Sequence, residues 1–338
     1  MTRGFYMKKF IGFEKGMGIG GWLTNYKRFN CLPMDRRLCL TVGDFEHFES
    51  YITEKDIQYI SELGMDHIRL GFDQIVLEER PGVYREEIFS LIERFVGWFE
   101  KYGLNTVLNL HKAIGNYCDI EEKVQLLDDG ALQERFIMLW EKLEDRFFDK
   151  PDVAFELLNE VRDVDSEKWN VLAEKTINAL RRKNPTRKII IGSTCWNSVH
   201  TLEKLKVFDD ENVIYTFHTY EPFSFTHQRG VLMPAPLYYN REMPYPCGIE
   251  RYRDYEKVVN GNENALQNYT VMDNKYISDN LAPALKFMKK NPDKILWCGE
   301  FGTIRHCRLE WRENWMRDVI CFPHFCSPVL FRLFRPLP

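Results

Sequence analysis

Short apolar runs that alternate with longer amphipathic segments limit how this chain can fold more than any other feature. Seven such runs are visible, and most are apolar at consecutive positions, as expected for strands that are buried on both faces. Parallel sheets with helical connections bury strands in this way, and this number of strand–helix units predicts an α/β fold, the (β/α)8 or TIM barrel. The runs lie at residues 15–22, 67–72, 105–111, 153–160, 188–193, 213–220 and 295–302.

The segments between the runs carry helix signals. In segment 53–64, Thr53 and Asp56 form a capping-box pattern and Gly64 supplies a stop. The apolar residues between Ile88 and Phe99 fall on one helical face. An open, doubly wound sheet is the alternative architecture, but no glycine-rich phosphate-binding loop follows the first run, so the barrel is favoured.

Two parts of the chain depart from this alternation. The connection 221–275 is rich in proline and tyrosine, and connections of this length inside compact domains are usually functional. We predict that it is an inserted lid subdomain, placed after the sixth strand of a single barrel domain that spans residues 1–338. The other part is the tail 321–338, which has four prolines and no acidic residue and predicts an atypical or incomplete eighth β/α unit.

The composition narrows the classes of partner. Lys and Arg number 46 and Asp and Glu number 50, a net charge of −4, so nothing favours binding to nucleic acid. No apolar run reaches the ~18 residues of a membrane span, and Glu14 and Lys15 interrupt any leader-like stretch. Nine cysteines without a C-x-x-C pair are typical of a reduced chain. We therefore expect that the protein binds neither nucleic acid nor a membrane. Its location is expected to be cytoplasmic, or else is not specified by the sequence.

Polar side chains gather at the ends of the apolar runs. In a (β/α)8 barrel the active site lies at the carboxyl ends of the strands, so these residues are expected to converge. A cationic side chain inside the second run would be very costly to bury without a partner, which predicts an ion pair there. The residues concerned are Arg69, His111, Asn159, Glu160, His218, Tyr220 and Glu300.

Two carboxylates among these residues match the chemistry of glycoside hydrolysis. One must be protonated to donate to the leaving oxygen, and the other must be ionised to attack the anomeric carbon. Glu160 is expected to be the acid/base, because burial at a strand end favours a protonated carboxyl group. Glu300 is expected to be the nucleophile, held ionised by Arg69 and Tyr220.

The remaining candidates would bind and orient the sugar. Asn159 is expected to bind the sugar 2-hydroxyl, and His111 and His218 to orient the sugar and the carboxylates. Trp196 and Asn197 follow the fifth run and are candidates for sugar contacts, with plain packing as the alternative.

Rival chemistries find less support in the residues. Metal-assisted hydrolysis would need a ligand pattern such as H-x-H or H-E-x-x-H, and the sequence has neither, so we predict no metal and no cofactor. A Schiff-base barrel would need a lysine at a strand end, where only Lys112 qualifies. A barrel that binds sugar without hydrolysing it is a further alternative.

Five short motifs, taken together, resemble glycoside hydrolase family 5 of clan A. "RLGFD", "LNLH", "FELLNE", "FHTY" and "CGEFG" occur in this order. The resemblance is to the cellulase-type endo-β-glucanases and spans roughly residues 13–320. It implies a (β/α)8 barrel and a retaining mechanism, with Glu160 as acid/base and Glu300 as nucleophile. Arg69, His111, Asn159, His218 and Tyr220 match the other positions of the family pattern.

The resemblance also implies a substrate and shows two departures. It predicts a retaining endo-β-1,4-glucanase that hydrolyses β-glucan polysaccharide or oligosaccharide without a cofactor. The alternatives are a β-mannanase, xyloglucanase or exo-β-glucanase on the same framework, or a sugar-binding barrel inactivated by its tail. The chain reads "NEV" where many members read "NEP", and its tail lacks the tryptophan that such proteins carry on the eighth strand.

Overall fold

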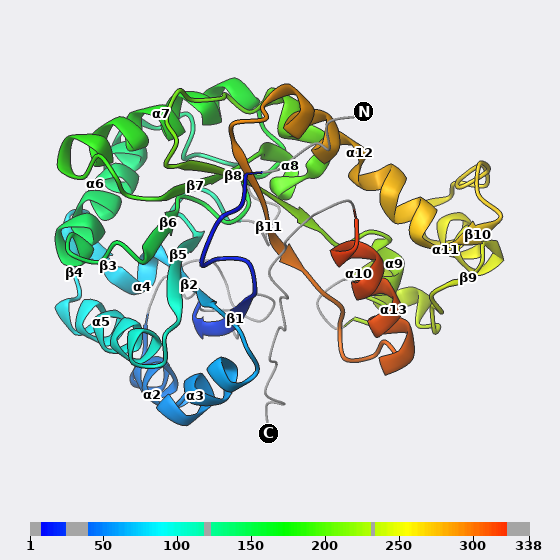
Figure 1. Ribbon diagram of the computed structural model, residues 1–338, viewed down its shortest axis with the longest axis horizontal. Helices are drawn as coiled ribbons and strands as arrows, with labels where there is room; N and C mark the ends of the chain where they lie inside the picture. Colours follow the sequence, from blue (N-terminus) through cyan, green and yellow to red (C-terminus); the bar gives the residue numbers. More distant parts are fainter. Residues whose placement is uncertain (1–7, 25–39, 118–122, 231–233, 323–338) are drawn as a thin grey trace, which may run out of the picture.

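A seven-stranded parallel sheet forms the centre of the molecule. The computed structural model describes residues 8–24, 40–117, 123–230 and 234–322. The strand order is β1-β2-β5-β6-β7-β8-β11, and every neighbouring pair is parallel. The sheet curls with helices on its outer side, as a (β/α)8 barrel requires (Figure 1). The strands are β1 (Gly16–Leu23), β2 (His67–Asp73), β5 (Asn105–Lys112), β6 (Val153–Glu156), β7 (Ile189–Gly192), β8 (Val213–Thr219) and β11 (Ile295–Phe301).

Helices connect successive strands of this sheet. The predicted capping box is present at α3, where the backbone N–H of Thr53 donates to the Asp56 carboxylate at 2.8 Å. A short hairpin of β3 (Glu78–Arg80) and β4 (Val83–Tyr84) follows α4 and was not predicted. The helices of the connections are α2 (Val42–Ser50), α3 (Glu54–Glu62), α4 (Gln74–Leu77), α5 (Glu86–Lys101), α6 (Gly130–Phe147), α7 (Ser166–Lys183), α8 (Thr194–Asn197), the 3-10 helix η2 (Val199–Lys204) and α12 (Asn274–Lys290), and α13 (Leu309–Ile320) follows β11.

The fourth strand of the sheet is shorter than its apolar run predicts. The run 153–160 was predicted as one strand, but β6 ends at Glu156. Beyond it, the N–H of Leu157 donates to Ile190 on one side and the N–H of Asn159 donates to Leu110 on the other. In a regular strand, residues two apart direct their N–H groups to the same neighbour, so this change from β7 to β5 shows that the chain has left the regular ladder. It carries Asn159 and Glu160 past the strand end.

Aromatic side chains fill the amino-terminal end of the barrel. Phe10 and Phe13 stack with ring centroids 4.2 Å apart, and Trp297 lies edge-on to Phe10 at 6.1 Å. The Trp297 indole N–H donates to the Phe13 carbonyl at 3.0 Å. His67 packs between Phe13 and Trp297, and burial lowers its pKa. This end of the barrel is therefore a packed core, and the strand ends opposite it are available for chemistry.

Gly16→Ala is expected to destabilise the protein by about 1–3 kcal/mol, because a Cβ at this position has no space. That atom would lie 1.9 Å from the His67 ring, which is itself held between aromatic rings. The control is Gly97→Ala on an exposed face of α5, where a Cβ meets nothing within 4 Å. Replacing a helical glycine should stabilise the protein by up to about 1 kcal/mol. Urea unfolding midpoints measure both changes, and a Gly16→Ala protein as stable as the wild type would refute the packing argument.

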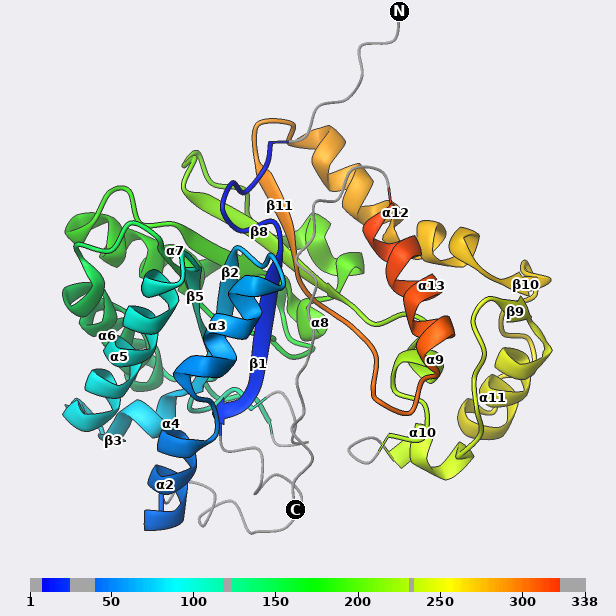
Figure 2. The ribbon, with the colours of Figure 1, turned by 60° about the horizontal axis from the view of Figure 1, so that its bottom comes forward.

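The insertion 221–275 folds into small elements beyond the carboxyl end of β8. These are α9 (Phe223–Thr226), α10 (Pro234–Tyr239), α11 (Glu250–Asn260) and a two-stranded sheet of β9 (Cys247–Gly248) and β10 (Val271–Met272). They extend to one side of the barrel in both views (Figures 1 and 2). That the insertion acts as a lid stays a prediction.

The base of the insertion is bonded to the strand ends. The Thr226 hydroxyl donates to the Tyr220 carbonyl at 2.6 Å, and the Ile304 N–H, after β11, donates to the Thr226 carbonyl at 2.8 Å. His227 stacks on Phe223 at 4.0 Å and meets the edge of the Tyr220 ring at 5.1 Å. The first turn of the insertion is thus part of the barrel's carboxyl-terminal face.

Some predictions fall at the limits of the described residues. The proposed eighth unit and tail begin at residue 321, and all of this segment except Cys321 and Phe322 lies outside the described ranges. Within those ranges, none of the helices has the length and apolarity needed to cross a membrane. The described cysteines, Cys195, Cys247, Cys298, Cys307 and Cys321, are free thiols.

Candidate active site

Six of the nine predicted site residues come together at the carboxyl ends of four strands. Arg69 comes from β2, Asn159 and Glu160 from the segment after β6, His218 and Tyr220 from the end of β8, and Glu300 from β11. Hydrogen bonds and ion pairs connect all six. Residues up to 231 positions apart in the sequence therefore form one polar group.

Each carboxylate oxygen of Glu300 accepts a hydrogen bond. Arg69 Nη1 donates to Oε1 at 2.6 Å, and the Tyr220 hydroxyl donates to Oε2 at 2.7 Å. Both contacts expected at Glu300 from the sequence are present. Because hydrogen bonds to the charged form favour it, this environment suits an ionised carboxylate.

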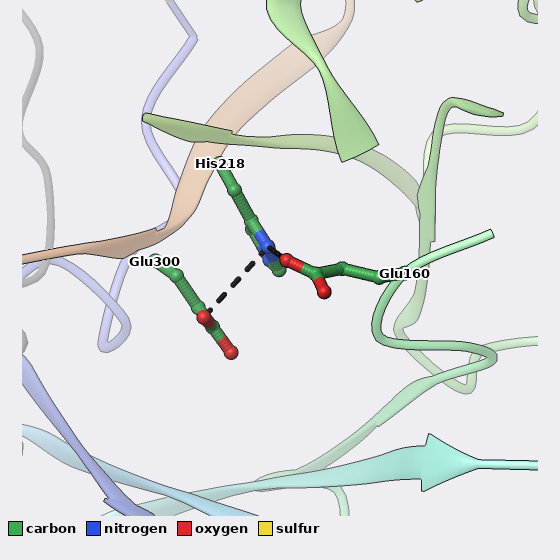
Figure 3. A group of neighbouring side chains, drawn as sticks. All are labelled: Glu160, His218 and Glu300. Atoms are coloured by element: carbon green, nitrogen blue, oxygen red, sulfur yellow. Dashed lines mark hydrogen bonds and ion pairs between the residues drawn. The ribbon is translucent and has the colours of Figure 1, made fainter. Parts of the chain in front are cut away.

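Glu160 lies beside His218, within reach of Glu300. A hydrogen bond of 2.9 Å joins His218 Nδ1 to Glu160 Oε1, and the same nitrogen is 3.8 Å from Glu300 Oε2. Figure 3 shows the imidazole between the two carboxylates. One oxygen from each glutamate and one histidine nitrogen all lie within 4.8 Å of one another. The two carboxylates are therefore close enough to act on the same bond of a substrate.

Arg69 is paired with a second carboxylate that the sequence analysis did not single out. Its Nε donates to Glu156 Oε2 at 2.6 Å, and its Nη2 donates to Glu156 Oε1 at 2.9 Å. Burial opposes the charged form of Arg69, but the charges of Glu156 and Glu300 outweigh it and raise the pKa of the guanidinium. One signal could have found Glu156: it is a lone acidic residue inside the apolar run 153–158.

Asn159 completes the bonds of this arginine. Its Oδ1 accepts from Arg69 Nη2 at 2.7 Å, and the residue is only 1% exposed. Since the oxygen faces Arg69, the amide nitrogen is directed away from it as a donor. That orientation suits a group that binds a sugar hydroxyl.

The other three predicted residues lie at neighbouring strand ends. His111 is the last residue but one of β5, and its Nδ1 is 3.2 Å from Asn109 Oδ1. Trp196 is 41% exposed after β7, in a turn where Cys195, Trp196 and Asn197 all have positive φ. Asn197 is buried, and its Oδ1 accepts from the Ser193 N–H at 3.0 Å, so it closes this turn. Sugar contacts by these residues stay predictions.

The same geometry could present ligands to a metal ion, since Glu160, His218 and Glu300 offer three ligand atoms within 4.8 Å. The bonds that these atoms already make argue for a different use. Both oxygens of Glu300 accept from neighbours, and His218 Nδ1 is bonded to Glu160. A divalent cation beside the Arg69 guanidinium would also be repelled. The arrangement fits a pair of reacting carboxylates better.

Comparison with known proteins agrees with this geometry. The family described as cellulase, glycosyl hydrolase family 5, matches residues 34–320, most of the chain. The chain belongs to glycoside hydrolase family 5. The family predicted from the five motifs is therefore confirmed, and so is the prediction that this protein is a glycoside hydrolase of the cellulase type.

Individual relatives cover nearly the whole chain. Endoglucanase C of Acetivibrio thermocellus is 36% identical over 317 residues, which is 92% of this chain and 87% of the relative. Cellodextrinase A of Ruminococcus flavefaciens is 34% identical over 318 residues, 93% of this chain and 82% of the relative. The crystal structure of endoglucanase Cel5A from Thermotoga maritima superposes with a TM-score of 0.71 at 25% identity, covering 95% and 90% of the two chains. The predicted (β/α)8 barrel is thus confirmed.

Proposed function

We propose that this family 5 cellulase is a retaining endo-β-1,4-glucanase in which Glu300 is the nucleophile and Glu160 the acid/base. The observation that carries the proposal is the separation of the two carboxylates, whose nearest oxygens lie within 4.8 Å. Retaining glycosidases hold their carboxyl groups about 5–5.5 Å apart, whereas inverting ones leave about 6.5–9.5 Å for a water molecule. The narrow spacing supports direct attack by one glutamate.

In the first step, an oxygen of Glu300 forms a bond to the anomeric carbon while the glycosidic C–O bond breaks. The Glu160 proton passes to the departing oxygen, which leaves as a hydroxyl group. Arg69 and Tyr220 hold the attacking carboxylate in place through its two oxygens. Restricting the nucleophile in this way lowers the entropy that must be lost at the transition state.

In the second step, water attacks the anomeric carbon of the glycosyl-enzyme ester. Glu160, now ionised, takes a proton from that water, and the C–O bond to Glu300 breaks to release the sugar and restore the carboxylate. Two inversions at the same carbon give net retention.

His218 can remain bonded to Glu160 through both steps. With its ring proton on Nδ1, His218 donates to Glu160 Oε1, which can accept whether or not the other carboxyl oxygen carries the exchanging proton, so the histidine need not gain or lose a proton. The 2.9 Å contact therefore keeps the acid/base oriented while its proton leaves and returns.

The choice of substrate rests on the relatives. They are called endoglucanase and cellodextrinase, which supports a β-1,4-linked glucan as the substrate of this chain. Asn159 would bind the 2-hydroxyl of the reacting sugar, His111 and Trp196 would contact sugar rings nearby, and Asn197 would support that surface. The insertion 221–275, rich in tyrosine, would form one wall of the cleft.

We expect the β-anomer to be the first product when the enzyme hydrolyses a soluble β-1,4-glucan. Proton NMR of the reaction within the first minutes, before mutarotation, measures this. A fall in viscosity that runs ahead of the release of reducing ends would identify endo action. Initial appearance of the α-anomer would refute retention. Faster hydrolysis of mannan, xylan or xyloglucan in a parallel panel would instead reassign the substrate within the same mechanism.

A further inference from the structure

Glu156 is a fully buried carboxylate in the barrel interior that the two-step mechanism does not use. It lies on β6, next to Asn109 of β5 in the sheet register, and its exposed fraction is 0%. Burying a carboxylate is costly unless it is paired, and Glu156 is paired with an arginine that also bonds the nucleophile. A barrel that needed only packing could place an apolar residue here.

The donors of Arg69 are divided among three acceptors. The Nε and Nη2 edge makes a two-bond contact with Glu156, Nη2 also reaches Asn159, and Nη1 is directed at Glu300. Two parallel bonds fix the plane of a guanidinium, which a single bond does not. The direction of the Nη1 donor toward Glu300 is therefore set by Glu156.

We propose that Glu156 is a positioning residue for the nucleophile: it orients Arg69 and offsets part of its charge, so that Glu300 is held in place yet remains reactive. The proposal rests on the proposed role of Glu300 as nucleophile. It assigns Glu156 no contact with the sugar.

The charges of Arg69, Glu156 and Glu300 explain why part of the Arg69 charge must be compensated. With Arg69 protonated and both glutamates ionised, the cluster has a net charge of −1, which becomes 0 when Glu300 forms its ester. Without the Glu156 charge, the same two states would carry 0 and +1. After attack, the buried Arg69 cation would then have no negative charge to compensate it. Before attack, ionised Glu300 would be stabilised in the free enzyme, and stabilising the ground state slows the reaction.

The acidic limb of the profile of kcat/KM against pH reports the ionisation of the free enzyme's nucleophile. Removing the negative charge of Glu156 removes a repulsion, so Glu300 should ionise at lower pH and the limb should move to lower pH. The charged or titratable groups of the described residues that face Glu300 include Arg69 of β2, Glu160 after β6 and Cys298 of β11, whose thiol pKa is raised by burial. His218 and Tyr220, at the end of β8, face it as well.

The test is Glu156→Gln, which preserves the shape of the side chain and removes its charge. With an aryl cellobioside whose first step is rate-limiting, kcat/KM should fall at least about tenfold, and the acidic limb should move down by about one pH unit. KM should change little, because no contact with the substrate is lost.

A matched control is available on the outside of the barrel. Glu144 of α6 is also 0% exposed and bonds Arg187 in the same two-bond manner, with Nε to Oε2 at 2.7 Å and Nη2 to Oε1 at 2.9 Å. Glu144→Gln should lower the melting temperature to a similar extent, while kcat/KM and the acidic limb stay at wild-type values. This separates a local effect on Glu300 from general destabilisation.

Glu156→Asp retains the charge but draws it back by one methylene group. It should lower kcat/KM while leaving the acidic limb in place, and it carries the test if Glu156→Gln does not fold. In that case the comparison is with Glu144→Asp, and equal kcat/KM for the two variants at equal melting temperature would overturn the proposal.

Two further outcomes would also overturn it. One is a Glu156→Gln enzyme with wild-type kcat/KM and an unmoved limb, and the other is an identical shift in Glu144→Gln. A wild-type protein that folds but hydrolyses neither β-glucan nor aryl cellobioside would refute the proposed function itself, which keeps the two failures distinct.

Discussion

Replacing Glu300 with alanine is expected to lower kcat by at least about 10⁴-fold on every substrate, because no atom is then placed to bond the anomeric carbon. The loss should not depend on the leaving group, since even an activated aryl glycoside needs the nucleophile. Initial rates on a soluble β-glucan and on a dinitrophenyl cellobioside measure it. Thermal unfolding checks that Arg69 and Tyr220, which lose their shared acceptor, still allow folding.

Azide adds a stereochemical control to the Glu300→Ala experiment. The small anion can occupy the space left by the carboxylate and attack the activated glycoside from the same face. A single displacement would give the α-glycosyl azide. If the variant kept more than about one hundredth of the wild-type kcat, or gave a β-product, the assignment of Glu300 as nucleophile would be contradicted.

Replacing Glu160 with alanine should have an effect that depends on the leaving group. On a polysaccharide, whose leaving oxygen needs a proton, the rate should fall by about 10²–10⁴-fold, the usual contribution of a general acid. On a dinitrophenyl glycoside the first step should be nearly unaffected, so the glycosyl-enzyme accumulates and a burst of dinitrophenol appears. Rapid-mixing absorbance measurements resolve the burst from the slow release that follows.

In the Glu160→Ala protein, azide should accelerate turnover by attacking the accumulated ester without a general base. Because this is the second inversion, the product is the β-glycosyl azide, the opposite anomer from that expected with Glu300→Ala. If both variants lose equal activity on the activated substrate, or give the same azide anomer, the two roles are assigned wrongly.

The architecture and the convergence of residues could be predicted because they depend on regular features. Strands that are apolar on both faces are typical of a parallel sheet, and the carboxyl ends of parallel strands lie at the same end of a barrel. Arg69 was recognised as a buried cation that needs a partner, and the structure supplies that partner twice, in Glu156 and Glu300.

Glu156 itself was missed, since nothing in the sequence shows that β6 lies two strands from β2 in the sheet, where Glu156 can reach Arg69. Inside an apolar run, a single acidic residue does not say which face of the strand it occupies or which strand it meets. The shortened end of β6 was missed for a related reason, since hydrogen bonds to two different neighbours are a property of the assembled sheet.

The turn after β7 has positive φ angles that its residue types do not predict. Cys195, Trp196 and Asn197 have φ values of 59°, 56° and 56°. Of these residue types only asparagine visits this region with any frequency, so the sequence predicts no such turn. Residues held in this region persist only where the surroundings determine them, and here the backbone N–H of Trp196 donates to the Val161 carbonyl at 2.8 Å, one residue after Glu160.

The bond between Thr226 and the Tyr220 carbonyl has a consequence for protein engineering. Exchanging the insertion between relatives is an obvious route to altered substrate range, but its first turn shares a backbone with the tyrosine that bonds Glu300. A junction placed at Glu221 would disturb Tyr220, and with it the hydrogen bond to Glu300, at the same time as it changes the insertion. A chimera that keeps residues 220–227 and begins the exchanged segment after them would change the insertion and leave these bonds in place.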